Sequence, residues 1–291
     1  MYDPAQLAAL EAVLRLGAFD AAAAELRITP SAVSQRIRAL ETQVGAPLVL
    51  RQSPARATDM GARLARHARD IALLDAALAN DLGQAMQARL RVALNADSLD
   101  TWAIPALAQT DFLFDIVVED ETASDQLLRN GEVTAAIMTR AAPVQGCETH
   151  ALGIMRYIAT CAPEFKARWF RDGVSPYSLS RAPMLDFSGK DRLQRGWLGQ
   201  ICDTPPAPPV HILPSTHGFV TAARCGLGWG LNPLPLVAED LKQGTLVAMS
   251  DTVRDVTLYW QVRSHAAPAV LPLTRALKRA ARTALLPVTP Q

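Results

Sequence analysis

The sequence predicts an α/β protein in which a small helical domain precedes a larger domain of alternating strands and helices. Three observations carry this prediction. Apolar residues follow helical spacing up to about Gln87, short apolar strands separated by helical stretches follow Arg89, and the 291 residues exceed what one hydrophobic core normally organises. Hydrophobic residues make up 49% and charged residues 20% of the chain, as in ordinary globular proteins. We therefore expect two or three folding units.

Short helices are predicted from Pro4 to about Ala57. Helical spacing puts four apolar side chains on one face of the first helix, namely Leu7, Leu10, Val13 and Leu14. A second helix is predicted over Phe19–Leu26, and a third runs from about Ser31 to Val44. Gly45 follows the third helix, where a helix end favours a residue that tolerates positive φ.

One long helix is predicted from Thr58 to about Gln87. Thr58 or Asp59 can cap its first turn, because short polar side chains accept hydrogen bonds from free backbone N–H groups. Leu64, Ile71 and Leu78 recur every seven residues, and Met60, Leu74 and Leu82 lie beside them. This spacing favours a seam between two copies of the chain. The alternative is a helix packed on its own domain.

After Arg89 the pattern changes to short apolar segments with helical stretches between several of them. The segments predicted as strands are Leu90–Asn95, Ile116–Glu119, Ala135–Met138, Tyr157–Cys161, Met184–Phe187, His211–Leu213, Trp229–Leu231 and Leu258–Val262. This alternation is typical of an α/β domain whose sheet is mostly parallel.

The segment from Phe19 to Gln43 has the composition of a DNA-reading helix pair. Apolar residues at helical spacing line the contact between the two helices: Leu26, Ile28, Val33, Ile37 and Leu40. The opposite face of the second helix presents hydroxyl, amide and guanidinium groups: Ser31, Ser34, Gln35, Arg36 and Arg38. Such groups suit base edges and phosphates in a major groove. Thr29, Pro30 and Ser31 add hydroxyls and free N–H groups at a helix N-terminus, which suits a phosphate oxygen.

A second basic element follows at Pro47–Thr58, where a strand, a turn, Arg51 and Arg56 could form a wing along the DNA backbone or minor groove. The net charge is only +1, but eight arginines and two acidic residues lie between Arg27 and Arg69. The basic patch is therefore confined to the front of the chain. The alternative is an amphipathic helix pair with a solvated polar face. The basic bias, the wing and the long helix that follows favour DNA binding over it.

These residues resemble the winged helix-turn-helix of LysR-type transcriptional regulators. The pattern is FxxAAxxLxITxSAVSQRIxxLE, followed by GxPLVxR, a proline, an arginine and TxxG. It corresponds here to Phe19, Ala22, Ala23, Leu26, Ile28, Thr29, Ser31–Ile37, Leu40, Glu41, Gly45, Pro47–Val49, Arg51, Pro54, Arg56, Thr58 and Gly61. The resemblance implies a linker helix that dimerises and a two-lobed effector domain with a periplasmic-binding-protein-like α/β fold, usually in a tetramer.

On that basis three domains are expected. Residues 1–58 form the winged helix-turn-helix, 59–87 the linker helix and 88–291 the effector domain. One lobe of the effector domain covers about 88–160 and 264–291, and the other covers about 161–263.

Later segments are similar to the ArgP/LysG subgroup of that family. They are NADSLxTWxxPALA at Asn95–Ala108, VEDET at Val118–Thr122, RxGEVxxA at Arg129–Ala136, the stretch Pro214–Val220, and LYW at Leu258–Trp260. Members of the subgroup sense basic amino acids and activate genes for amino-acid export and related metabolism. The resemblance implies promoter DNA and a small amino-acid effector as partners, a homodimer or homotetramer, RNA polymerase as a possible further partner, and no cofactor.

Two helix N-termini in the second domain suit a carboxylate. Asn95–Ser98 and Pro214–Thr216 each end a predicted strand and open a helix, so free N–H groups and the helix dipole favour an anion there. Hydroxyl groups add donors at both places: Ser98, Thr101, Ser215 and Thr216. Because strand ends border the ligand cleft in α/β sheets, we expect the effector at these positions.

Acidic residues near strand ends are candidates for binding an ammonium group or a cationic side chain: Asp97, Glu119, Asp120, Glu121 and Asp186. Trp102 could form a wall of the pocket, and Met138 and Thr139 could line it. Two alternatives stay open. The Asp and Ser side chains could merely cap helices, and Arg140 and Arg156 could turn the preference of the pocket toward anions.

His217 departs from the subgroup, which tends to carry an acidic residue in this serine-rich loop. A histidine is neutral or cationic near pH 7. The departure argues against lysine or arginine and leaves histidine, a neutral amino acid or a related metabolite as effector. The stretch between Trp102 and Val118 is also shorter than in the subgroup, so that side of the cleft could be remodelled.

Other signals exclude several classes of protein. The start of the chain lacks the features of a signal peptide, and no apolar run reaches the roughly 20 residues that span a bilayer, so a cytoplasmic protein without a membrane partner is expected. Four separated cysteines indicate reduced thiols. Gly226–Gly230 lacks the order of a dinucleotide loop, and Cys147 and His150 have no second pair of metal ligands. An enzyme is therefore a weak alternative, and the balanced charge argues against an architectural DNA-binding protein without a ligand.

Overall fold

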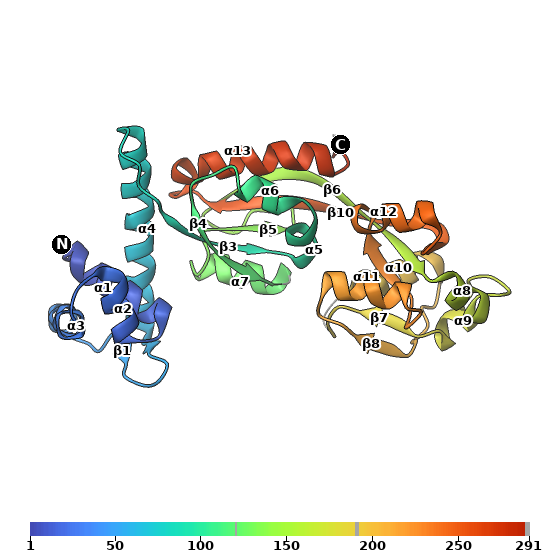
Figure 1. The fold of residues 1–291 in the computed structure, drawn as a ribbon, viewed down its shortest axis with the longest axis horizontal. Coiled ribbons are helices and arrows are strands. Elements are labelled where there is room, and N and C mark those ends of the chain that lie inside the picture. The colour runs from blue at the N-terminus through green and yellow to red at the C-terminus, as the bar shows by residue number, and fades with distance from the viewer. Residues whose placement is uncertain (120, 190–191, 289–291) are drawn as a thin grey trace. The chain divides into compact units, whose positions relative to one another are not determined.

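The computed structural model describes residues 1–119, 121–189 and 192–288 (Figure 1). It divides into two compact units. Unit 1 comprises Met1–Leu90 and Phe112–Phe114, and unit 2 comprises Arg91–Asp111 and Asp115–Gln291. Among the described residues, no helix has both the length and the apolar character needed to cross a membrane.

Unit 1 is a winged helix-turn-helix continued by a long helix. Its elements are α1 (Pro4–Leu16), α2 (Phe19–Leu26), α3 (Pro30–Val44), β1 (Val49–Leu50), β2 (Arg56–Ala57) and α4 (Asp59–Asp81). Strands β1 and β2 pair antiparallel and form the wing. Threonine hydroxyls begin two of the helices: Thr29 Oγ1 accepts from the Ala32 N–H at 3.2 Å, and Thr58 Oγ1 accepts from the Gly61 N–H at 3.0 Å. The three predicted helices and the wing are therefore confirmed.

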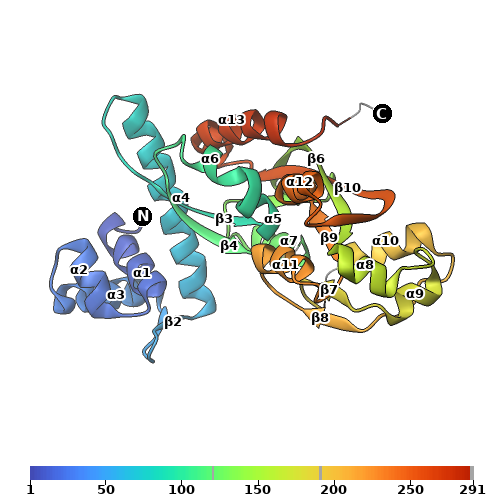
Figure 2. The ribbon, with the colours of Figure 1, turned by 45° about the vertical axis from the view of Figure 1, so that its right-hand side comes forward.

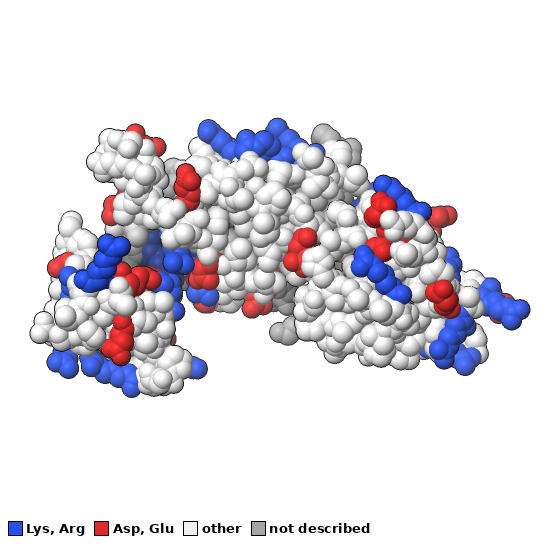
Figure 3. All heavy atoms as spheres, in the orientation of Figure 1, with Lys and Arg blue, Asp and Glu red and all other residues white. Residues whose placement is uncertain are grey.

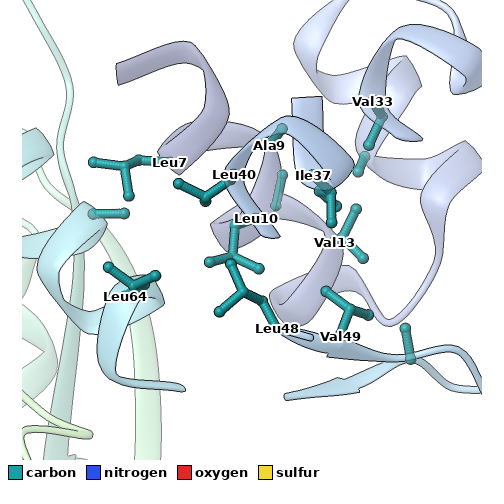
Figure 4. Close-up of a cluster of buried hydrophobic side chains, with 14 of the residues drawn as sticks. Leu7, Ala9, Leu10, Val13, Val33, Ile37, Leu40, Leu48, Val49 and Leu64 are labelled. Carbon is teal, nitrogen blue, oxygen red and sulfur yellow. The ribbon is translucent and has the colours of Figure 1, made fainter. Parts of the chain in front are cut away.

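One core joins the helices of unit 1 to the wing. The fully buried side chains of Leu10, Ile37, Leu40 and Leu48 come from α1, α3 and the segment before β1, and they point toward one another in Figure 4. Gly61 allows α4 to approach the wing, because a Cβ at this position would lie 1.9 Å from the Leu48 carbonyl oxygen. Helix α3, which is predicted to read DNA, and the wing are thus fixed to one rigid core.

Helix α4 ends at Asp81, earlier than the predicted end near Gln87. Gly83 takes a positive φ of 77°, and the Asn80 side chain bonds both the N–H and the carbonyl of Met86 at 2.9 and 3.0 Å, which closes a loop in place of further helix. The predicted heptad row also changes along the helix, from a buried Leu64 to an exposed Leu78. Leu64 is buried in the core of unit 1, whereas the second half of the helix exposes large apolar side chains: Leu74 at 43%, Leu78 at 60% and the C-cap residue Leu82 at 68%.

Unit 2 is a two-lobed α/β domain (Figures 1 and 2). The first lobe contains β3 (Arg89–Leu94), α5 (Ala96–Ser98), a π-helical turn η1 (Leu99–Ala103), α6 (Ile104–Leu107), β4 (Leu113–Val118), α7 (Glu121–Arg129), β5 (Ala135–Met138) and α13 (Ala267–Ala284). The second lobe contains α8 (Pro163–Trp169), α9 (Pro176–Arg181), β7 (Met184–Asp186), α10 (Leu193–Ile201), β8 (Val210–Ile212), α11 (Thr216–Arg224), β9 (Gly230–Pro233) and α12 (Leu234–Gln243).

Two long strands, β6 (Cys147–Cys161) and β10 (Val247–Arg263), run through both lobes. They pair antiparallel from Cys147↔Arg263 to Cys161↔Val247. The last part of β10 also pairs with β5 of the first lobe, through Tyr259↔Met138 to Val262↔Ala135. The segment Leu258–Val262 therefore lies in the first lobe, although the sequence placed it in the second.

The main sheet has the order β4-β3-β5-β10-β6-β9. Strands β3 and β5 are parallel, but β10 is antiparallel to β5 and β6, and β9 is antiparallel to β6. The expectation of a mostly parallel sheet is therefore wrong. The apolar runs at Tyr157–Cys161 and Leu258–Val262 are only the buried ends of β6 and β10. The rest of this antiparallel pair was not predicted, because charged residues such as Arg156 and Asp255 interrupt the apolar pattern.

Candidate DNA-binding face and effector site

The residues predicted to read DNA lie at the start of α3 and along its surface. Pro30, Ser31, Gln35 and Arg38 are exposed, and Ser34 and Arg36 are half-buried. The exposed N-cap Thr29 also lies 2.9 Å from the Ser31 hydroxyl, oxygen to oxygen. Val33, Ile37 and Leu40 on the opposite face are fully buried. The polar face of α3 is therefore exposed, while its apolar face is packed in the core of unit 1.

Short hydrogen bonds attach the wing to α3 and α4. The Glu41 carboxylate of α3 accepts from the backbone N–H groups of Leu48 and Val49 at 2.8 and 3.3 Å. Thr58 Oγ1 donates to the Pro47 carbonyl at 2.8 Å. The wing then exposes Arg51, which also lies over the Phe19 ring at 5.5 Å, and Arg56. Arginine side chains gather along the lower edge of unit 1 in Figure 3.

Unit 2 encloses a cavity of about 680 Å³. Its wall is formed by residues at the ends of β3, β4 and β5, by β6, α10, α11, β9 and β10, and by the loop after β7. The volume suits a small organic molecule such as an amino acid. Asp97 and Glu119 are the only charged side chains among the described lining residues, so the wall carries negative charge.

Asp97 is held in place by two hydroxyl groups. The Tyr157 hydroxyl of β6 donates to Asp97 Oδ2 at 2.7 Å, and the Thr216 hydroxyl of α11 donates to Asp97 Oδ1 at 3.1 Å. Tyr157 and Thr216 are each only 4% exposed. All three residues line the cavity, so the half-buried carboxylate of Asp97 is fixed in its wall.

Three side-chain amides in the wall carry a buried carbonyl oxygen that has no hydrogen-bond partner within the described part of the chain: Asn95, Gln194 and Asn232. Native proteins rarely leave such oxygens unpaired. Together with the two carboxylates, they make the cavity rich in hydrogen-bond acceptors. A ligand with N–H donors and positive charge is therefore the chemical complement of this wall.

Of the residues predicted to bind the effector, the structure brings Asp97, Glu119, Thr139 and Thr216 to the cavity. Seven others are not in its lining: Ser98, Thr101, Trp102, Met138, Asp186, Ser215 and His217. Asp120 and the side chain of Glu121 lie outside the described part of the chain.

The seven residues outside the lining have other surroundings. Ser98, Trp102 and Met138 are buried behind the wall, and Ser215 is the N-cap of α11, where it accepts from the Gly218 N–H at 3.1 Å. The buried Asp186 carboxylate accepts from the N–H of the lining residue Ser188 at 3.3 Å, and Thr101 Oγ1 donates to the Asp97 carbonyl. His217 is exposed on α11.

The two arginines that could have favoured an anionic ligand are paired elsewhere. Arg156 donates to both carboxylate oxygens of Asp255 at 2.8 and 2.7 Å, and this hydrogen bonding holds the pKa of Asp255 below its usual value. Arg140 Nη2 donates to Asp125 at 2.8 Å. Neither arginine lines the cavity, so neither reverses its charge.

Several lining residues were missed by sequence reasoning, among them Tyr157, Phe187, Gln194, Phe219 and Asn232. Asn232 carried a usable signal, because it is a polar residue inside the buried strand β9. Gln194 is likewise polar on the buried face of α10, next to Trp197 and Leu198. Tyr157 and Phe219 looked like ordinary core residues, and only the fold brings them to the cavity.

Two family patterns cover most of the chain. The pattern described as "Bacterial regulatory helix-turn-helix protein, lysR family" matches residues 4–62, and the "LysR substrate binding domain" matches residues 83–282. The chain is 42% identical over 283 residues to the HTH-type transcriptional regulator LysG of Mycobacterium tuberculosis, covering 96% of this chain and 93% of that protein. It is 40% identical over 289 residues to the lysine export transcriptional regulatory protein LysG of Corynebacterium efficiens, covering 97% and 99% of the two chains.

Two solved structures share this fold over nearly the whole chain. ArgP from Mycobacterium tuberculosis has a TM-score of 0.82 at 40% identity and covers 99% of this chain and 100% of its own. Full-length LysG from Corynebacterium glutamicum with bound effector Arg has a TM-score of 0.69 at 36% identity, covering 98% and 100%.

The chain belongs to the LysR family of bacterial transcriptional regulators. It is a DNA-binding regulator with an effector-binding domain, and its relatives are named regulators rather than enzymes. The predicted family and fold are thereby confirmed, and the comparisons do not favour the enzyme or the ligand-free architectural protein.

Proposed function

We propose that this regulator binds a basic amino acid of the lysine and arginine class in the cavity of unit 2, and that binding controls genes for amino-acid export or metabolism. The observation that carries the proposal is the negative, acceptor-rich wall, in which Asp97 and Glu119 are the only charged residues described. The arginine bound to LysG of Corynebacterium glutamicum and the lysine-export name of the Corynebacterium efficiens relative support the same class. His217 does not argue against it, because this residue is exposed and not in the lining.

The two ends of the amino-acid head group have distinct receptors in this proposal. Asp97 accepts the α-ammonium, since its negative charge lies in the cavity wall and its position is fixed by Tyr157 and Thr216. The N-terminal turn of the nine-residue helix α11, which brings Thr216 to the cavity, offers backbone N–H groups and the helix dipole to the α-carboxylate. Glu119 supplies a second negative charge for the cationic side chain.

The regulator reads promoter DNA through α3 and the wing. The side chains proposed to contact bases and phosphates are Thr29, Pro30, Ser31, Ser34, Gln35, Arg36 and Arg38 on α3 and Arg51 and Arg56 on the wing. Two observations support these contacts: the surface of α3 is polar, and Glu41 attaches α3 to the wing through hydrogen bonds. A protein that acts on promoters works where the chromosome lies, so a cytoplasmic location belongs to this proposal.

Oligomerisation brings two DNA readers together. The exposed Leu74 and Leu78 and the neighbouring Leu82 suit a seam between the linker helices of a homodimer, and two such dimers would form a homotetramer. Effector binding then favours one of two oligomer geometries, for which a coupling of about 1–3 kcal/mol suffices. In the activating geometry the regulator would assist RNA polymerase at the promoter.

A thermal-shift screen of the full-length protein against the twenty amino acids tests this function. A ligand that binds only the folded state at about 100 times its Kd adds about 2.7 kcal/mol of stability, which raises the Tm. We expect lysine or arginine to raise it, Asp97→Asn to abolish the response, and Asp100→Asn, which changes an exposed acid outside the lining, to keep it.

The outcomes separate the parts of the proposal. No shift with lysine or arginine would refute the effector class while leaving family membership intact. A wild-type response in Asp97→Asn would move the ammonium receptor to another residue.

A further inference from the structure

We propose that Gln194 and Asn232 form the subsite for the side-chain end of the effector and make the site selective for a donor-rich group such as guanidinium. This inference rests on the proposed function, because it concerns the same cavity. It assigns specificity to two neutral amides of the second lobe rather than to the carboxylates.

Gln194 is fixed by the packing of α10. Its side chain is buried at 2% exposure and lines the cavity, yet its Oε1 has no hydrogen-bond partner within the described chain. Trp197, one turn further along the helix, donates its indole N–H to the Thr252 carbonyl at 2.8 Å. Trp197 also packs on the ring of Trp229 with 5.3 Å between the centroids. The helix therefore holds Gln194 at the wall.

Asn232 is fixed by the pairing of β9 with β6. It lies opposite Ile158 in the ladder and is fully buried. Its Nδ2 donates to the Thr160 hydroxyl at 2.9 Å and lies 3.5 Å from the Gly230 carbonyl oxygen. Both neighbours accept a hydrogen bond from the NH₂ group, which orients the amide and leaves Oδ1 without a partner in the described chain.

Gln194 Oε1 and Asn232 Oδ1 both have no hydrogen-bond donor within the described chain, and both residues line the same cavity. A buried carbonyl oxygen without a donor is unfavourable, and proteins pair most of them. Since both residues line the cavity, a ligand with several N–H donors inside it can offer a hydrogen bond to each of them. A guanidinium offers five N–H donors in a planar fork and an ammonium offers three, whereas an alkyl end offers none. The amides thus favour arginine over lysine and reject norleucine.

Calorimetric titration of the full-length protein with arginine, lysine and norleucine tests the subsite. Gln194→Met keeps the side-chain volume and removes the amide, so we expect the Kd for arginine to rise about tenfold or more and the Kd for lysine to rise less. Gln194→Glu adds a charge at the same place and should lower both values several-fold. The matched control is Thr149→Val, which removes a buried hydroxyl of β6 that lies outside the cavity and has no hydrogen-bond partner among the described residues, and it should change neither Kd.

A second variant keeps the test independent of α10. Asn232→Leu should also raise the Kd for arginine more than the Kd for lysine. Thermal unfolding would confirm that each variant is folded. If wild type binds arginine or lysine but both variants keep its Kd values and its arginine-to-lysine ratio, the subsite is wrong and the proposed function stands. If wild type binds neither amino acid, both the function and the subsite are overturned.

Discussion

The DNA-binding face and the effector cavity are built in opposite ways. The proposed DNA contacts fall between Thr29 and Arg56, on one helix and the wing that follows it, and most of them are exposed. The cavity wall draws on residues between Asn95 and Leu258, and its central carboxylate is bonded by residues 60 and 119 positions away. The proposed DNA-binding face is a surface made by residues that are close together in the sequence. The effector cavity is made by residues far apart in the sequence, so it forms only after the whole of unit 2 has folded.

This difference explains why the two sites respond differently to substitution. A surface contact can be removed without disturbing the core beneath it, so changes on α3 alter binding alone. In the cavity, some polar side chains also hold a neighbour in place, as Tyr157 and Thr216 do for Asp97. The sharpest tests therefore change a residue in one unit and measure both promoter binding and effector binding.

Gly61→Ala should have the largest effect, and it should be confined to unit 1. The added methyl group would lie 1.9 Å from the Leu48 carbonyl oxygen, so α4 and the wing must separate at a cost of about 3 kcal/mol. We expect promoter binding in a gel-shift assay to be lost or strongly weakened while calorimetry still detects effector binding by unit 2. Gly45→Ala is the control, since no atom lies near its Cβ and only its φ of +76° is strained, at about 1 kcal/mol. Equal promoter binding by both variants would show that the close approach of Gly61 to the Leu48 carbonyl does not stabilise the DNA-binding unit.

The sequence predicted the elements of unit 1 well because their signals are local. Thr29, Gly45 and Thr58 mark helix ends within the segments that they terminate, and these marks agree with the structure. The same reasoning failed for α4 after Asp81, where a side-chain bond from Asn80 to Met86 replaces the helix. It also missed the length of β6 and β10, because one half of each strand is mostly partly exposed and resembles a surface loop in sequence.

The cavity was predictable only in part. Asp97, Glu119, Thr139 and Thr216 follow strand ends or open a helix, and the rule that such positions border a ligand cleft brought them to the right place. Gln194 and Asn232 obey no such rule, since pairing of distant strands and packing of α10 decide where they point. Whether any of these residues binds the effector stays a prediction until the variants are measured.

Gln35→Ala or Arg36→Ala, also in unit 1, should have the next largest effect. Loss of a base contact typically weakens specific DNA binding by about 1–3 kcal/mol, and α3 should stay folded because Ile37 and Leu40 hold its other face. The assay is gel-shift affinity for a cognate promoter, alongside the Tm shift caused by the effector, which should not change. Arg275→Ala, an exposed arginine of α13 in unit 2, is the matched control. Wild-type promoter affinity in both α3 variants would disprove the recognition-helix assignment.

The smallest expected effect concerns an ion pair of unit 2 and depends on pH. Arg224 donates to both oxygens of Asp240 at 2.7 and 2.6 Å, and this hydrogen bonding lowers the pKa of Asp240 below its ordinary 3.8. A lowered folded-state pKa adds stability above the unfolded value and loses it as the pH falls through the folded one. Arg224→Met should therefore cost about 1 kcal/mol near pH 7, since the Arg224 side chain is 43% exposed and partly screened.

The decisive measurement is the difference in Tm between wild type and Arg224→Met as the pH is lowered from neutral to below about 4. It should shrink only at the acidic end of that range. Arg156→Met offers a comparison at a more exposed pair, whose two side chains are 37% and 36% exposed, and its difference should be smaller throughout. A constant difference across the pH range would mean that Arg224 stabilises unit 2 by packing rather than by its carboxylate partner. Because the four paired residues belong to unit 2 and none of them is in the cavity lining, promoter affinity and effector Kd should stay unchanged in both variants, which separates stability from function.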